Sequence, residues 1–318
     1  MTHTDLQHCM EVCLFVPPAR AYRGPRKRGT MERNAAGWGS GFFGVVIFSG
    51  SLPATRLAIV DFSPLFLTSA RAVIAALIGG VFLAGLRQVR PAPRDLLSLA
   101  IVAMGVVIGF PLLTGLALQQ ITAAHSIVFI GLLPLATAIF GVVRAGERPK
   151  PAFWLFSCLG AATVAGFAMS RSADGSMAGD LLMIAAVIVC GLGYAEGATL
   201  SRRLGGWQVI SWALLLALPL MAGIALAVRP DHLNGIGLPA WLSLGYVSVF
   251  SMLIGFVFWY RGLALGGIAG VGQLQLMQPF LGLALSAVVL GETIAWPMLA
   301  ASGIVVLCVA GARRFAGR

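Results

Sequence analysis

Charged residues are scarce in this chain of 318 residues. Asp, Glu, Lys and Arg together make up 10% of it, whereas a water-soluble domain draws about a quarter of its residues from these four types. With so little charge, a globular fold could not cover its surface with groups that water solvates. Because 58% of the residues are apolar and the mean hydropathy is +0.91, most of the chain is predicted to lie in lipid.

Cysteine and histidine are also few. Of the five Cys, Cys158, Cys190 and Cys308 lie within apolar runs, while Cys9 and Cys13 lie in a polar segment, so no extracellular disulfide framework is predicted. No His, Cys or carboxylate cluster has metal-ligand spacing, and no glycine-rich phosphate loop occurs. The net charge of +11 is scattered between apolar runs rather than gathered on one basic face. We therefore expect no metal, no cofactor and no nucleic-acid partner.

Long apolar runs account for most of the chain. About 20 apolar residues cross the hydrocarbon layer as a helix, and cutting the chain at charges, Pro pairs and Gly clusters leaves ten such runs. They are predicted at 37–57, 64–85, 96–118, 122–143, 152–170, 179–200, 207–228, 239–260, 268–290 and 295–312. The sequence thus predicts an all-α membrane protein with ten transmembrane helices, preceded by a disordered cytoplasmic tail of residues 1–36.

The positions of the cations predict the orientation. Lys and Arg in short loops stay on the cytoplasmic side. If the N-terminus is cytoplasmic, 18 of the 22 Lys and Arg lie inside, and only Arg56, Arg171 and Arg229 lie outside, with Arg71 within the second span. A missed or extra span would scramble this asymmetry. Ten spans with both termini in the cytoplasm are therefore predicted.

Two stretches of the chain repeat each other. They share Pro, Val, Gly and Glu at a constant offset of 145, and the tetrapeptide Gly-Leu-Ala-Leu precedes each of them. The stretches are 134–147 (PLATAIFGVVRAGE) and 279–292 (PFLGLALSAVVLGE), and the tetrapeptides are 115–118 and 262–265.

The repeated stretches are predicted on opposite sides of the membrane, since Glu147 falls in a cytoplasmic loop and Glu292 in an external one. Residues 37–170 and 178–313 are therefore predicted to be inverted five-helix repeats. Such repeats are typical of transporters, because two pseudo-symmetric halves can exchange inward-open and outward-open states around one midplane site.

The same residues resemble a known family, the drug/metabolite transporter superfamily and its EamA-type ten-helix exporters. The segments that carry the resemblance are Trp38-Gly39-Ser40, 67–77 (LTSARAVIAAL), 117–147 with Gly146-Glu147-Arg148, and 179–182 (GDLL). The resemblance covers residues 37–313. It implies an exporter of small metabolites, often amino acids, in the bacterial inner membrane, with a cavity lined by spans 1–4 and 6–9 and with spans 5 and 10 outside.

Ionisable residues within the spans are candidates for function, because each costs about 3 kcal/mol at the centre of a membrane helix. Tyr194 and Glu196, in the sixth span, are candidates for substrate binding or coupling. Glu196 is a candidate to bind an amino group or a proton; alternatively it bonds Arg202 or Thr199. Arg71 is a candidate to neutralise a substrate carboxylate or to pair with Glu196, and the alternative is a structural ion pair or helix anchor.

Four further residues are candidates. His125, at the outer start of the fourth span, belongs to the residue type whose charge changes near neutral pH, and the alternative is an interfacial residue. Gln275 and Gln278 share a helix face, and their amides suit either a zwitterionic substrate or hydrogen bonds between helices. Trp38 lies near the cytoplasmic mouth, where it gates the path or anchors the helix.

Pro134 and Pro279 are predicted in mid-helix, where each removes a backbone hydrogen bond. Because the pair recurs in both halves, both are predicted hinges, with a fixed kink as the alternative. Trp259 and Tyr260, which precede Arg261, are predicted to lie in an interfacial aromatic belt.

The function that these patterns favour is export of small metabolites, amino acids or related compounds, by alternating access. No ATP-binding motif is present, so the energy is predicted to come from the solute gradient, from protons or from a counter-transported solute. The expected assembly is a monomer or a homodimer. Two other classes remain as alternatives: an intramembrane enzyme with Ser40 as nucleophile and His125 as base, and a membrane scaffold without transport.

Overall fold

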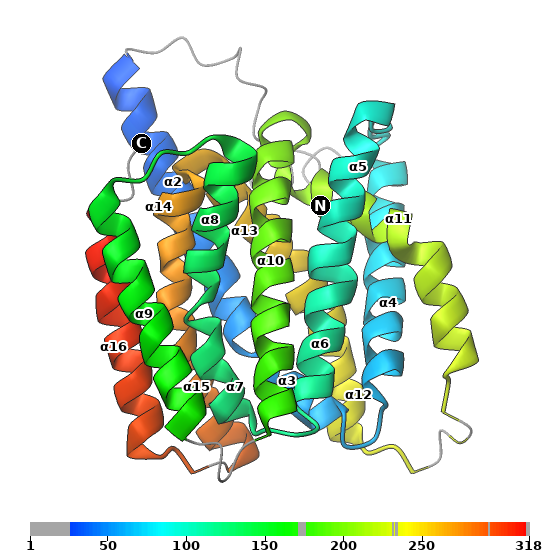
Figure 1. Cartoon of the computed structure of the whole chain (residues 1–318). Coiled ribbons are helices and arrows are strands. Elements are labelled where there is room, and N and C mark those ends of the chain that lie inside the picture. Colours follow the sequence, from blue (N-terminus) through cyan, green and yellow to red (C-terminus); the bar gives the residue numbers. More distant parts are fainter. Residues whose placement is uncertain (1–25, 171–175, 231, 233–234, 292, 316–318) are drawn as a thin grey trace.

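The computed structural model describes residues 26–170, 176–230, 232, 235–291 and 293–315. Helices form most of this part of the chain, which contains no β-strand, and they run side by side as a bundle (Figure 1). The chain is an all-α membrane protein.

The first half consists of five apolar spans. Spans 2 and 5 are single helices, whereas spans 1, 3 and 4 are each built from consecutive helical segments. Span 1 is α2 (Arg26–Ser49) and α3 (Ser51–Ala58); span 2 is α4 (Pro64–Gly85); span 3 is α5 (Pro93–Val102), the π-helix η1 (Ala103–Gly109) and α6 (Phe110–Ala117); span 4 is α7 (Ala123–Ile130) and α8 (Leu133–Ala145); span 5 is α9 (Pro151–Ser170).

In the second half, spans 8 and 9 are built from consecutive helical segments, as their counterparts 3 and 4 are, and spans 6, 7 and 10 are single helices. Span 6 is α10 (Met177–Leu204); span 7 is α11 (Gly206–Ala227); span 8 is α12 (Leu238–Gly245), the π-helix η2 (Tyr246–Ile254) and α13 (Gly255–Gly266); span 9 is α14 (Ile268–Gly272), the 3₁₀-helix η3 (Gln273–Met277) and α15 (Gln278–Leu290); span 10 is α16 (Trp296–Arg313).

Among the described residues, eight spans are long and apolar enough to cross a membrane, and spans 5 and 10 hold shorter apolar segments, 151–160 and 296–312. The predicted bounds of the second and ninth spans are those observed. The first helix differs from the prediction, because α2 begins at Arg26 and so extends into the segment 1–36 that was predicted to be disordered. The apolar part of this span begins at Ala35.

Polar residues just ahead of the apolar runs set where several helices begin. The side chains of Ser63, Thr122 and Ser176 each accept a hydrogen bond from the backbone N–H three residues later, at 3.2, 3.1 and 3.3 Å. Such caps satisfy backbone donors that have no partner within the helix. They start α4, α7 and α10 at the ends of their spans that were predicted to be external.

The packing of the spans has a twofold pattern. Span 1 packs on span 8, and their counterparts in the other half, spans 6 and 3, also pack on each other. Likewise, span 4 packs on span 6, and their counterparts, spans 9 and 1, pack on each other. Spans 2 and 7, spans 4 and 9, and spans 5 and 10 pair with their own counterparts, and α9 and α16 lie together at one edge of the bundle (Figure 1). This exchange of each span with the one five later is what inverted repeats produce. It also leaves spans 5 and 10 at the periphery, as expected.

Glycines make the two equivalent contacts close. A Cβ added to Gly262 of α13 would lie 2.7 Å from the backbone nitrogen of Gly41 in α2. In the counterpart contact, a Cβ on Gly193 of α10 would lie 3.3 Å from the Cα of Gly105 in η1. Backbones approach this closely only where small residues face each other, which is how helices associate in lipid.

The described ends of the chain lie at one end of the bundle. The Lys150 N–H donates to the Phe315 carbonyl at 2.8 Å, which places the C-terminal end of α16 beside the start of α9, and Figure 1 shows the start of α2 at the same end. We call this the inner end, because its connections hold most of the Lys and Arg and the positive-inside rule assigns it to the cytoplasm. The opposite end is the outer end.

Candidate functional site

A small cavity lies between the two halves, at the middle of several spans. Its volume is about 20 Å³, room for about one water molecule. It is lined by Phe48, Ser51, Leu52, Arg71, Val106, Phe110, Pro111, Leu133, Tyr194, Ser251, Phe256 and Gln278. These residues come from spans 1–4, 6, 8 and 9, so the predicted set of lining spans is observed except for span 7, which packs behind α4.

Breaks in the helices supply much of this lining. Val106 belongs to η1, and Ser251 belongs to η2, the counterpart of η1 in the other half. Leu133 follows the break between α7 and α8, and Gln278 follows η3. Irregular backbone at membrane depth is tolerated where protein or a polar cavity covers it, and π-helical and 3₁₀ segments within helices often mark functional positions.

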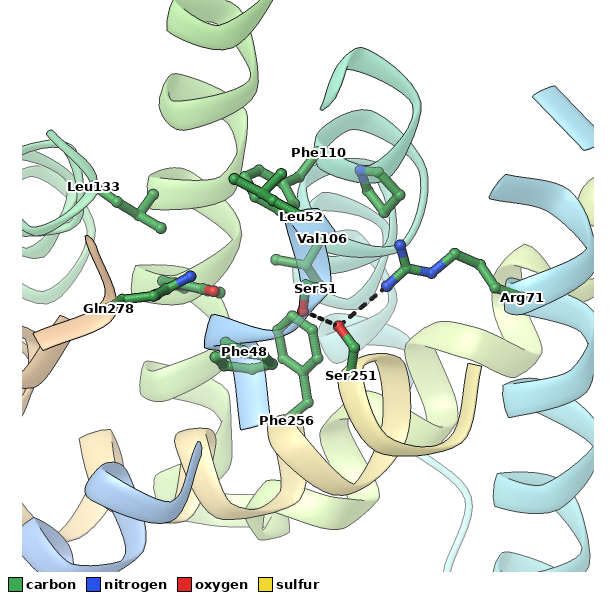
Figure 2. A pocket seen from close by; sticks show the side chains of 12 residues that line it. Phe48, Ser51, Leu52, Arg71, Val106, Phe110, Leu133, Ser251, Phe256 and Gln278 are labelled. Carbon is green, nitrogen blue, oxygen red and sulfur yellow. Dashed lines mark hydrogen bonds between the residues drawn. The ribbon is translucent and has the colours of Figure 1, made fainter. Parts of the chain in front are cut away.

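Arg71 reaches the cavity from α4 (Figure 2). Its side chain is buried, with 5% of the residue exposed, and its Nη2 donates to Ser251 Oγ at 3.2 Å. The Ser251 hydroxyl in turn shares a hydrogen bond of 2.7 Å with the Ser51 hydroxyl from α3. Within the described part of the chain, Arg71 Nε has no hydrogen-bond partner and no carboxylate forms an ion pair with the guanidinium. The predicted pair between Arg71 and Glu196 is therefore wrong.

Aromatic rings form another wall. The ring of Tyr194 lies 6.4 Å from that of Phe48, 5.9 Å from that of Phe256 and 5.5 Å from that of Trp259, between ring centres. Trp259 and Tyr260 have no exposed surface, so their predicted place in an interfacial belt is wrong. They face the bundle because α13 packs against α2 and α10.

Of the two predicted glutamines, Gln278 lies on the opposite side of the cavity from Arg71 (Figure 2). Gln278 lines the cavity and is 7% exposed, whereas Gln275 lies one turn earlier, is fully buried and does not line it. Gln278 Oε1 has no hydrogen-bond partner among the described residues, and a buried amide oxygen without a partner costs about 1–3 kcal/mol. Gln278 is therefore the glutamine placed for polar recognition, whereas Gln275 lies beside the Tyr194 side chain of α10, as the alternative of a contact between helices expects.

Glu196 lies away from this cavity, toward the inner end of α10. Its Oε2 accepts a hydrogen bond from Arg144 Nε at 2.6 Å and its Oε1 accepts one from Ser98 at 2.5 Å. The expected alternative partners, Arg202 and Thr199, are not the ones observed. Glu196 thus joins spans 3, 4 and 6 at the inner end.

Two more carboxylates at the inner end accept hydrogen bonds, one from an arginine and one from backbone N–H groups. Asp95 at the start of α5 accepts from Arg203 Nη2 at 2.5 Å. Glu147 accepts from the backbone N–H groups of Ile268 and Ala269, the first residues of α14, at 3.3 and 3.2 Å. The positive end of a helix dipole favours a carboxylate in this position. Glu292, its repeat counterpart, lies outside the described residues.

His125 lies at the outer end, in the first turn of α7. Its Nε2 lies 2.8 Å from Asp180 Oδ1 in the first turn of α10, a partner that the sequence did not predict. Ser40 is elsewhere, between α2 and α13, where its hydroxyl donates to the Phe258 carbonyl at 2.8 Å. The structure therefore does not bring together the nucleophile and base of the enzyme alternative.

Trp38 and the two prolines lie outside or beside the cavity. Trp38 is half-buried near Gly266 at the inner end and does not line the cavity. Pro134 and Pro279 are not in mid-helix, because each occupies the first turn of a new helix after a break in its span. Proline fits the first turn because its missing N–H has no partner there in any case. Both breaks are where hinges were predicted, and hinge motion itself stays a prediction.

Sequence reasoning missed Ser51, Ser251 and Asp180. The two serines look like ordinary small residues of apolar spans, and only their neighbours make them part of the site. Asp180 did carry a signal, because an acidic residue at the start of an apolar run stands where a helix enters the membrane.

Comparison with known families agrees with this architecture. The model of the EamA-like transporter family matches residues 36–169 and again residues 177–313. The chain belongs to the EamA-like transporter family. Each matched segment holds five of the ten spans.

Two relatives and one solved structure are similar to this EamA-like chain. "Uncharacterized transporter YdeK" of Bacillus subtilis (strain 168) is 64% identical over 286 residues, covering 90% of this chain and 100% of the relative. "Uncharacterized transporter sll0355" of Synechocystis sp. is 23% identical over 268 residues, covering 77% of this chain and 80% of the relative. A solved structure described as "Crystal structure of protein" has a TM-score of 0.65 at 20% identity, covering 89% of this chain and 98% of its own, which shows a shared fold.

Proposed function

We propose that this EamA-like transporter exports small metabolites that carry a carboxylate, amino acids among them, across the plasma membrane of a bacterium by alternating access. The observation that carries the proposal is Arg71, a buried cation without a carboxylate partner among the described residues, facing a cavity at the middle of the spans. An uncompensated charge in this position is costly. A substrate carboxylate would compensate it.

The rest of the cavity supports a zwitterionic substrate. The Ser251 and Ser51 hydroxyls lie beside the guanidinium, and Gln278 Oε1 lies across the cavity, where it can accept a hydrogen bond from an amino group. Phe48 and Tyr194 provide apolar and aromatic surface between the two. At about 20 Å³ the cavity is smaller than any amino acid. Substrate entry therefore requires the two halves to move apart on one side, which is the motion of the proposed cycle.

The breaks before Pro134 and Pro279 are the hinges of this cycle in our proposal. The inner and outer halves of spans 4 and 9 can tilt separately there, because no continuous run of α-helical hydrogen bonds crosses the breaks. The solute gradient, protons or a counter-transported solute supplies the energy, and the chain works as a monomer or a homodimer.

Efflux from proteoliposomes tests the proposal. Vesicles are loaded with a labelled amino acid or with the amine that lacks its carboxylate. We expect the amino acid to leave, the amine to stay, and Arg71→Gln to slow efflux about 100-fold, since loss of a buried charge pair costs about 3 kcal/mol. Arg229→Gln, at an exposed outer position, is the matched control. If Arg71→Gln and wild type show equal efflux, the proposal that Arg71 binds a substrate carboxylate is wrong. If no labelled metabolite leaves the vesicles, the proposal that the protein exports small metabolites is wrong.

Glu196 remains the proposed proton-coupling residue at the inner end. The ion pair with Arg144 must separate when the inner end opens, which exposes the carboxylate to cytoplasmic water. Glu196→Gln should therefore change both the rate of efflux and its dependence on pH. If both are unchanged, coupling through Glu196 is wrong.

A further inference from the structure

The contact between His125 and Asp180 is a buried pair between the two repeats. The imidazole Nε2 lies 2.8 Å from the carboxylate oxygen, and both residues are 6% exposed. His125 belongs to α7 in the first half and Asp180 to α10 in the second. Relative movement of the halves at the outer end must therefore lengthen this contact.

The pair lies at the outer side of the cavity, beyond an apolar layer. Leu52 lines the cavity and also packs in the cluster formed with Leu118, Ile121 and Ile127 around the starts of spans 4, 6 and 10. This cluster closes the cavity toward the outer end. Opening the outer end exposes Leu52 and separates the helices that carry the pair.

The chemistry of this pair differs from that of the ion pairs at the inner end. Arg144 and Arg203 stay charged at every physiological pH, so the inner pairs do not gain or lose a proton through their cations. Histidine changes its charge near neutral pH. With the proton bound, His125 and Asp180 form a charge-assisted hydrogen bond, which is about twice as strong as a neutral one.

The charged groups around His125 come from the helices that pack against α7. Among the described residues of the helices that pack against α7, Asp180 comes from α10 and Arg56 from α3, where its guanidinium donates to the Leu118 carbonyl. The sequence of α15 contains no charged residue, and the basic residues of span 10 lie at its inner end. Asp61, in the connection after α3, accepts from the Gly237 N–H at 2.8 Å.

We propose that His125 and Asp180 form a proton-binding site that stabilises the closed outer end. A proton from the external medium binds the imidazole, strengthens the contact with Asp180 and favours the state in which the two halves touch. A ligand that binds one state more tightly shifts the equilibrium toward that state. External acid should therefore hold the cavity closed to the outside. The inference rests on the proposed alternating-access cycle.

The test measures opening directly, without substrate. Leu52→Cys is made in a protein whose five native cysteines are replaced by alanine, and a membrane-impermeant maleimide is added outside oriented vesicles. Because thiols react faster as pH rises, each rate is divided by that of Val60→Cys, an exposed residue (76%) at the outer end. We expect the ratio to be about tenfold higher at about pH 8 than at about pH 5.5. With His125→Gln or Asp180→Asn, it should be high at both.

The outcomes separate this inference from the proposed function. A ratio that does not change with pH in the wild-type background, or that changes equally in His125→Gln and Asp180→Asn, overturns the proton site. If the Leu52→Cys protein is never labelled although the Val60→Cys protein is, the outer end does not open and both proposals are wrong. If labelling follows pH as expected but no metabolite leaves loaded vesicles, the proton site stands and the export function does not.

Discussion

The inner and outer ends of the bundle are joined by different chemistry, although the two halves of the fold are pseudo-symmetric. At the inner end, Glu196 and Asp95 meet arginines. At the outer end, Asp180 meets a histidine. The contacts between backbones obey the twofold pattern, whereas the pairs of Glu196 with Arg144 and of Asp95 with Arg203 have no counterpart at the outer end among the described residues. A few side chains at the two ends can therefore make the inner and outer ends of a pseudo-symmetric fold chemically different.

The first prediction concerns the inner end and has the largest expected effect. Arg144→Ala leaves the buried Glu196 carboxylate with Ser98 alone. Because 39% of the Arg144 side chain is exposed and solvent screens part of the attraction, we expect a loss of about 2.5 kcal/mol, less than for a fully buried pair. The free energy of unfolding in mixed micelles measures this loss. Arg148→Ala, an exposed cation nearby, should change it by less than about 0.5 kcal/mol. Equal effects of the two substitutions would show that the ion pair does not stabilise the inner end.

The second prediction compares Arg71, in the cavity, with the arginines of the inner end by the effect of its replacement on stability. Arg71→Met replaces a buried cation that has no carboxylate partner among the described residues, so the protein should become more stable by about 2 kcal/mol while efflux is lost. The same unfolding assay and the efflux assay check the two parts. A less stable Arg71→Met protein would contradict the prediction, because Arg71 would then be a structural residue.

The third prediction concerns the outer end and has the smallest expected effect. His125→Gln should lower the free energy of unfolding by about 1 kcal/mol, because it removes the buried hydrogen bond between the imidazole and Asp180. Unfolding in mixed micelles measures the loss, and Arg144→Ala is the comparison at the inner end. If His125→Gln costs as much as Arg144→Ala, the two ends do not differ in the way described.

The sequence predicted the spans well, because the requirement for about 20 apolar residues is local and each helix satisfies its own backbone in lipid. The second and ninth spans have the predicted bounds. The family also followed from the order and duplication of the segments. The helix breaks were predicted less well, because only the prolines of spans 4 and 9 were interpreted as breaks. Pro111 likewise lies in the first turn of α6, directly after the π-helix η1 of span 3.

Partners of polar residues were the least predictable part of the site. Glu196 pairs with Arg144, which lies 52 positions away, and His125 with Asp180, 55 positions away. Ser51 and Ser251 meet across 200 positions. Hydropathy identifies which residues lie in helices but not which helices are neighbours, so reasoning from single spans placed Glu196 with Thr199 or Arg202 on its own helix.

The sequence by itself determined that this protein lies in a membrane, how many apolar helices it has and that its halves repeat, because hydropathy and charge act on each segment independently of the others. Only the tertiary structure decided that Arg71 faces a cavity in which no described carboxylate pairs with it, that Glu196 belongs to the inner end, and that His125 has an acidic neighbour. These contacts join residues far apart in the chain, and the close packing of glycine-rich helices sets which of them meet.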